Sequence, residues 1–269
     1  MTQKAIAKLI QIKKGRISHY ENGHRHPTIN IFLKWIDVLK ISKKSIESHI
    51  IIFNYPKINF ILNKFPYKEM PEHAEIIAHT LFDGTVGRGN SFYYETRNNM
   101  EQEMFSDLVK KIGMGTALYH SNQNGVKSYG LSSVASNLLI NHYGFERRKL
   151  PKKIIALALK NPSWKNSILR ACFIDEGSNG KIKLKDNILV ASSLKNEILA
   201  KQIVQLLKNN YSHKLCIYHK RNEFSILLHN KSLTDFYNNT LKDIEYECYY
   251  KKVNTQRMIC RLQPSKFRW

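Results

Sequence analysis

The 269-residue sequence has few acidic residues, few cysteines and no long apolar run. Its 21 Asp and Glu residues stand against 43 Lys and Arg residues. No apolar run approaches the roughly 18 residues of a membrane-spanning helix, and the first residues lack the apolar core and small-residue cleavage site of a signal peptide. The cysteines have no CxxC spacing, which argues against a zinc ribbon or a disulfide framework. We therefore expect a soluble, cytoplasmic protein whose four thiols pack in a core, at Cys172, Cys216, Cys248 and Cys260.

The net charge of +22 is spread along the chain rather than held in one basic tail. Residues 1–69 contribute +9, residues 70–160 contribute +3, and residues 161–269 contribute +10. The hydrophobic fraction of 42% argues against disorder, which combines high charge with little apolar content. A positive field of this size attracts polyphosphates, so nucleic acid is the favoured partner, while a Lys-rich composition from an AT-rich genome is the alternative.

Residues 2–42 have the pattern of two short helices joined by a tight turn and followed by a packing helix. Ile6, Leu9 and Ile10 recur at helical spacing, a second helix ends at Asn22 and Gly23, and a third opens at Pro27 and Thr28. The segment resembles the phage-repressor (Xre-type) helix-turn-helix family; an ordinary amphipathic helix pair is the alternative. The resemblance implies that the second helix enters the major groove, with base-reading positions at Lys14, Gly15 and His19 and phosphate-proximal positions at Gln3 and Asn22.

A repeat at an offset of 93 residues organises the rest of the chain. IIAHTLFDGTVG at residues 76–87 aligns with LRACFIDEGSNG at residues 169–180, so that Asp83 faces Glu176. After each copy the pattern runs as helix, two strands, helix, two strands, helix. We predict an α+β fold of two tandem αββαββα halves with pseudo-twofold symmetry. The predicted divisions are a helix-turn-helix segment at 1–45, a connector at 46–69, a first half at 70–160 and a second half at 161–269.

Each repeat copy places a carboxylate at the end of an apolar helix, next to a glycine able to adopt a left-handed cap. The small residues Ala78 and Ala171 would let the two helices approach closely, so that both carboxylates meet at one end. Two acids on a twofold axis within a basic surface form a site for divalent metals that act on a phosphodiester. The alternative is that the two acid-glycine pairs only cap helices before turns.

Both segments resemble the LAGLIDADG motif of the LAGLIDADG homing endonucleases in their single-chain, two-motif form, and residues 147–177 resemble that family's linker. The resemblance implies that Asp83 and Glu176 bind Mg²⁺ and that Lys149 and Lys252 help to position water or to stabilise the phosphate, with Lys152 and Lys251 as rivals. It also implies a saddle of two four-stranded sheets over double-stranded DNA with a long pseudo-palindromic site, bound by a monomer. The strand residues expected to reach the DNA are Arg88, Tyr93, Arg97, Lys127, Lys181, Lys183, Lys185, Lys220 and Arg221.

The motifs depart from that family at the seventh position, which is usually small but here holds Phe82 in one copy and Asp175 in the other. His79 is also unusual at its position, and a packed or interfacial histidine is favoured there over a metal ligand. These departures leave three functions open. The first is a site-specific Mg²⁺-dependent DNA endonuclease, the second is a DNA-binding regulator derived from one with weak or no cleavage, and the third is an RNA maturase.

Overall fold

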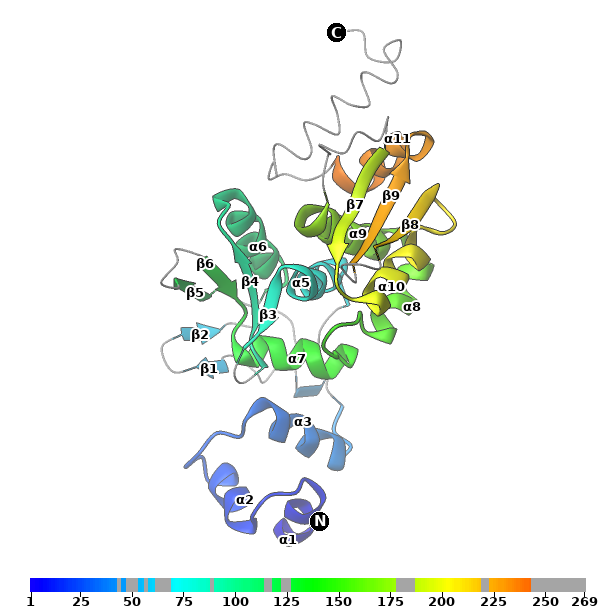
Figure 1. Cartoon of the computed structure of the whole chain (residues 1–269). Coiled ribbons are helices and arrows are strands. Elements are labelled where there is room, and N and C mark those ends of the chain that lie inside the picture. Colours follow the sequence, from blue (N-terminus) through cyan, green and yellow to red (C-terminus); the bar gives the residue numbers. More distant parts are fainter. Residues whose placement is uncertain are drawn as a thin grey trace.

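The N-terminal segment of the computed structural model forms three helices, α1 (Gln3–Leu9), α2 (Lys14–Glu21) and α3 (Ile29–Val38), which lie at one end of the molecule (Figure 1). Thr2 caps α1, because its Oγ1 accepts a hydrogen bond from the backbone N–H of Ala5 at 3.3 Å. A small separate core forms between the helices, and α3 closes it with Trp35. Leu9 does not join this core, since 59% of it is exposed. The core residues are Ile6, Ala7, Ile10 and Ile17.

The structure describes ten stretches of the chain, which together contain all the elements below. They are residues 1–42, 45–46, 53–55, 58–60, 69–87, 90–113, 118–121, 127–177, 187–218 and 223–242. Within the predicted connector, β1 (Phe53–Tyr55) and β2 (Ile58–Phe60) form an antiparallel pair.

The first half has the predicted order of elements. Its sheet is antiparallel in the order β3-β4-β6-β5. Asn98 and Ser132 begin two of its helices with side-chain caps, and Gly144 ends the last of them in a left-handed conformation. The elements are α5 (Pro71–Phe82), β3 (Gly84–Val86), β4 (Phe92–Thr96), α6 (Asn99–Lys111), β5 (Leu118–Ser121), β6 (Lys127–Gly130) and α7 (Ser133–Tyr143).

The second half follows a linker helix, α8 (Lys152–Lys160), and repeats most of this plan. Its described strands pair antiparallel in the order β7-β9-β8, which reproduces the order β4-β6-β5 of the first half. The strand predicted near residues 180–186 lies outside the described residues. The elements are α9 (Pro162–Glu176), β7 (Asn187–Leu194), α10 (Glu197–Leu207), β8 (His213–Tyr218), β9 (Glu223–His229), a 3₁₀ turn (Asn230–Ser232), α11 (Leu233–Phe236) and a π-helical turn (Tyr237–Leu241).

Helices α5 and α9 lie side by side between the two sheets (Figure 1). Ala78 and Ala171 are fully buried in the main core that these helices share. The helix-turn-helix segment meets this body through α3, where Asn30 Oδ1 accepts a hydrogen bond from Asn141 Nδ2 of α7 at 2.9 Å. Within the described ranges, no helix is long and apolar enough to cross a membrane.

A buried histidine makes the stability of the first half depend on pH. His73 Nδ1 lies 2.7 Å from the Tyr143 hydroxyl, and burial, together with the nearby charge of His142, lowers its pKa to about 4. The unfolded chain protonates at a pKa near 6.5, so the stability that neutral His73 contributes is complete above that pH.

This contribution is lost as the pH falls from about 6.5 to about 4, and it amounts to about 3 kcal/mol at 1.36 kcal/mol per pKa unit. Urea unfolding at pH 7 and pH 4 measures the loss, which His73→Gln should reduce. The exposed His26→Gln serves as the control. An unchanged pH dependence in His73→Gln would contradict this assignment.

Candidate functional site

The two motif helices run parallel. Near their middle, Arg170 Nη1 of α9 lies 3.5 Å from Glu75 Oε2 of α5, and further along, His79 Nδ1 of α5 lies 2.9 Å from Asp175 Oδ2 of α9. Because the contacts advance in the same direction along both helices, their C-terminal ends lie at the same end of the pair.

The predicted acids occupy that shared end. Asp83 is the C-cap of α5 and is exposed, whereas Glu176 is the last residue of α9 and is partly buried. Among the residues the structure describes, no three His, Cys, Asp or Glu side chains gather as a ready-made metal site. Two carboxylates nevertheless fit Mg²⁺, which prefers oxygen donors and commonly takes one or two carboxylates with water and substrate phosphate oxygens.

The glycines after the acids serve close packing, so the predicted left-handed caps are wrong. Gly177 has φ −73° and ψ 157°, and Gly84 is not among the described glycines with positive φ. A Cβ on Gly177 would lie 2.3 Å from the carbonyl oxygen of Phe173, and a Cβ on Gly84 would lie 2.3 Å from that of Tyr93. Both positions exclude a side chain because backbone atoms occupy the space.

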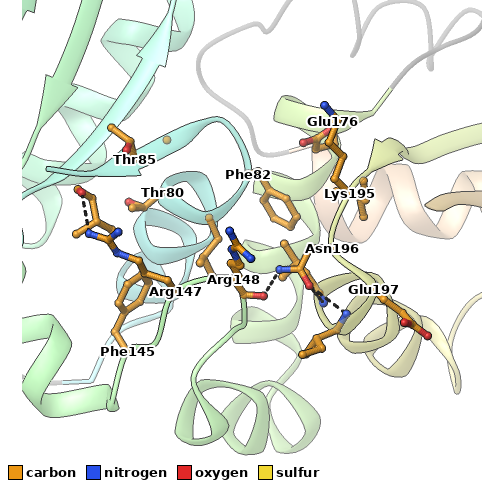
Figure 2. A pocket seen from close by; sticks show the side chains of 16 residues that line it. Thr80, Phe82, Thr85, Phe145, Arg147, Arg148, Glu176, Lys195, Asn196 and Glu197 are labelled. Atoms are coloured by element: carbon orange, nitrogen blue, oxygen red, sulfur yellow. Dashed lines mark hydrogen bonds between the residues drawn. The ribbon is translucent and has the colours of Figure 1, made fainter. Parts of the chain in front are cut away.

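A cleft of about 930 Å³ opens beside Glu176, between the two halves (Figure 2). The end of α5, strand β3, the residues after α7 and the start of α10 line it. Three cationic side chains belong to this lining, which also includes Glu176 (Figure 2). Phe82 also lines the cleft, at the motif position that is usually small. The cations are Arg147, Arg148 and Lys195.

The basic run at residues 147–149 was the signal for Arg147 and Arg148, but the residue predicted from that run was Lys149. Lys149 Nζ pairs with Glu146 Oε2 at 2.5 Å and does not belong to the cleft lining. Arg147 Nη2 donates a hydrogen bond to the carbonyl oxygen of Val86 at 3.3 Å. Arg148 instead extends into the middle of the cleft (Figure 2).

Helix α10 of the second half holds this basic segment in place. Arg148 has φ 68°, a strained value for a residue with a side chain, and its carbonyl oxygen accepts a hydrogen bond from Asn196 Nδ2. Asn196 Oδ1 also caps α10, since it accepts from the backbone N–H groups of its first turn. Gln202 clamps Leu150 by accepting from its N–H at 2.9 Å and donating to its carbonyl oxygen at 3.0 Å.

In the helix-turn-helix segment, α2 presents the predicted base-reading side chains to solvent. Lys14 and His19 are both exposed on this helix. Gln3 Nε2 donates to Glu21 Oε2, and Asn22 Nδ2 donates to Ser18 Oγ at 3.3 Å, so these two amides have partners within the segment.

The remaining predicted DNA contacts are described only in part. Arg97 is exposed just after β4, Tyr93 is half-buried within that strand, and Lys127 begins β6. The other predicted contacts and the predicted basic residue Lys252 lie outside the described residues, at Arg88, Lys181, Lys183, Lys185, Lys220, Arg221 and Lys252.

Comparisons with known proteins separate the N-terminal segment from the rest of the chain. Residues 1–45 match the helix-turn-helix family. No curated protein matches the chain.

Several solved structures are similar to the larger body. A mesophilic variant of the homing endonuclease I-DmoI is 13% identical with a TM-score of 0.48 and covers 64% of this chain and 96% of its own. The homing endonuclease I-WcaI bound to its DNA recognition sequence is 18% identical with a TM-score of 0.48, and the match covers 68% of this chain and 85% of I-WcaI. The N-terminal LAGLIDADG domain of DUF199/WhiA is 14% identical with a TM-score of 0.45, and the match covers 67% of this chain and 87% of that domain. The chain thus joins an N-terminal helix-turn-helix segment to an α+β body that is similar to LAGLIDADG homing endonucleases.

Proposed function

We propose that this chain is a site-specific double-strand DNA endonuclease of the homing type. One observation carries the proposal: the parallel helices α5 and α9 end together with Asp83 and Glu176, beside a cleft lined by cationic side chains. Carboxylates next to cations suit a reaction in which a metal ion and a phosphate must meet.

The proposed roles follow from the chemistry of the side chains. Asp83 and Glu176 would bind Mg²⁺, which, when bound, activates water and stabilises charge that develops on the phosphate. Arg148 and Lys195 would neutralise phosphate charge in the cleft, with Arg148 held there by Asn196. Because both acids belong to one chain, the active unit would be a monomer on a pseudo-palindromic site.

Incubation with Mg²⁺ and a randomised duplex library, followed by sequencing of the cleaved ends, tests the proposal. We expect a defined set of cleaved sequences with partial twofold symmetry. If the protein binds a subset of library members and cleaves none of them, a second function is favoured, namely a DNA-binding regulator that has lost cleavage. Phe82 in the cleft, at a position expected to be small, is the observation that favours this alternative.

The helix-turn-helix segment is proposed to bind DNA that flanks the cleaved site. Lys14 and Arg16 are exposed on α2, and each phosphate contact contributes about 0.9 to the slope of log affinity against log salt concentration. Lys14→Ala combined with Arg16→Ala should therefore weaken binding and lower this slope by up to about 1.8.

Fluorescence anisotropy at several salt concentrations measures the slope. Lys160→Ala, at the exposed end of α8, removes a charge away from α2 and the cleft and should leave the slope unchanged. A double variant with the slope and footprint of the unmodified protein would show that α2 does not touch DNA. We expect the double variant Lys14→Ala with Arg16→Ala still to cleave DNA at the same bond.

A further inference from the structure

Two polar pairs cross the buried interface between α5 and α9. His79 and Asp175 both have fully buried side chains, and their closest atoms lie 2.9 Å apart. The Tyr94 hydroxyl donates a further hydrogen bond to Asp175 Oδ1 at 2.9 Å. Burial lowers the pKa of His79, but the charge and hydrogen bond of Asp175 outweigh burial and raise it overall. His79 and Asp175 therefore form a buried, hydrogen-bonded polar pair across the interface.

The second pair lies nearer the middle of the helices. Glu75 is 2% exposed, and the Arg170 guanidinium lies 3.5 Å from its carboxylate. Arg170 Nε also donates to the carbonyl oxygen of Thr240 at 3.1 Å, which holds the guanidinium in place. Burial raises the pKa of Glu75 overall, while the charge of Arg170 opposes that rise and favours the ionised carboxylate.

The repeat shows that these pairs break the symmetry of the interface. At the offset of 93, the charged residues Glu75 and His79 align with Ile168 and Cys172, while Arg170 and Asp175 align with Ile77 and Phe82. At each of these four positions, the residue aligned with the charged side chain is uncharged. Three of these uncharged residues are fully buried, and the fourth, Phe82, is partly buried.

Pairing of like helices from two chains would leave the charges without partners. By the same register, α5 against a second α5 would set His79 against Phe82 and Glu75 against Ile77. A second α9 against α9 would set Asp175 against Cys172. A buried charge that loses its partner is strongly destabilising, whereas a complementary pair is tolerated. Polar residues at helix interfaces are known to select partners in this way.

We propose that the pairs His79–Asp175 and Glu75–Arg170 select the helix partner, so that α5 accepts α9 and rejects the same helix of a second copy. The two halves then assemble within one chain and not through like-with-like contacts between chains. This inference is independent of DNA binding and of cleavage.

The test makes the two helices alike in the full-length chain. A fourfold variant carries, at each charged position, the residue of the other half, namely Glu75→Ile, His79→Cys, Arg170→Ile and Asp175→Phe. After refolding from denaturant under reducing conditions at rising protein concentration, light scattering gives the mass. We expect the unmodified protein to stay at the 31.5 kDa of one chain and the variant to move toward twice that mass.

Cross-linking of carboxylates in a mixture of ¹⁵N-labelled and unlabelled variant chains identifies the new contact. Cross-links that join α5 to α5 of another chain support the proposal, and cross-links only between α5 and α9 contradict it. Ile77→Val with Ile168→Val loosens the same interface without changing its charges and should remain monomeric.

If the fourfold variant does not refold, exchanging the charges of Glu75 and Arg170 tests the same proposal. Arg170→Glu alone places two carboxylates together and should lose the monomeric fold, whereas Glu75→Arg combined with Arg170→Glu restores a complementary pair and should recover it. A fourfold variant that folds and stays monomeric at every concentration overturns the proposal, as does an exchanged pair that fails to recover.

Discussion

Replacement of Glu176 by Gln is expected to reduce Mg²⁺-dependent DNA cleavage by at least about 1,000-fold, because removing a metal-binding carboxylate removes several kcal/mol of transition-state stabilisation. Asp83→Asn should have an effect of similar size. Both substitutions keep the size and shape of the side chain while an amide replaces the charged carboxylate, so the shared end of α5 and α9 should keep its structure. Single-turnover cleavage of a selected duplex measures the loss.

Affinity for the same duplex in Ca²⁺ provides the control and should change little, because neither acid is proposed to read bases. Asp235→Asn, an exposed acid on α11, should leave both cleavage and affinity unchanged. Undiminished cutting by either Glu176→Gln or Asp83→Asn would remove that residue from the proposed metal site. Equal loss of affinity and cleavage would indicate damage to the fold instead.

Gly84→Ala and Gly177→Ala are each expected to destabilise the chain by about 3 kcal/mol or more, a lowering of the unfolding midpoint by roughly 10 °C. The added Cβ would meet a carbonyl oxygen at 2.3 Å in both cases, and rotation of a side chain cannot relieve a clash with backbone. At Gly84 the end of α5 would have to move away from β4, and at Gly177 the backbone would have to shift away from the last turn of α9. Thermal unfolding followed by circular dichroism measures the shift.

Gly15→Ala supplies the matched comparison for this pair. Gly15 lies within α2 with no atom within 4 Å of an added Cβ, so alanine there should stabilise the helix by up to about 1 kcal/mol. Normal stability of Gly84→Ala would show that the close approach at that glycine is dispensable.

The duplicated segments made much of the architecture predictable from sequence. The offset of 93 aligned Asp83 with Glu176, and the structure places both at one end of a parallel helix pair. The helix-turn-helix segment was also predictable, because Asn22, Gly23 and Thr28 are boundary residues whose local chemistry ends or begins a helix.

Features that depend on tertiary geometry were not predictable in the same way. The choice between Arg148 and Lys149 rests on a positive φ angle and on Asn196, which is 48 residues away in the chain. The two motif glycines looked like turn residues, yet each is required because a backbone carbonyl oxygen approaches it closely, that of Tyr93 on β4 at Gly84 and that of Phe173 in the last turn of α9 at Gly177. The partner of His79 likewise depends on how α5 and α9 are aligned, which local periodicity does not determine.

The parallel course of α5 and α9 places the negative ends of both helix dipoles at the same end of the pair. Each helix contributes about half a negative charge at its C-terminal end, and Asp83 and Glu176 add their carboxylates there. A phosphate approaching this point is repelled by it while the surrounding Lys and Arg side chains attract it. In the proposed function, a divalent cation bound there would offset the repulsion, and cation and DNA would then each raise the affinity of the protein for the other by the same factor. The duplicated helices would thereby couple the occupancy of the metal site to the occupancy of the DNA surface within one chain.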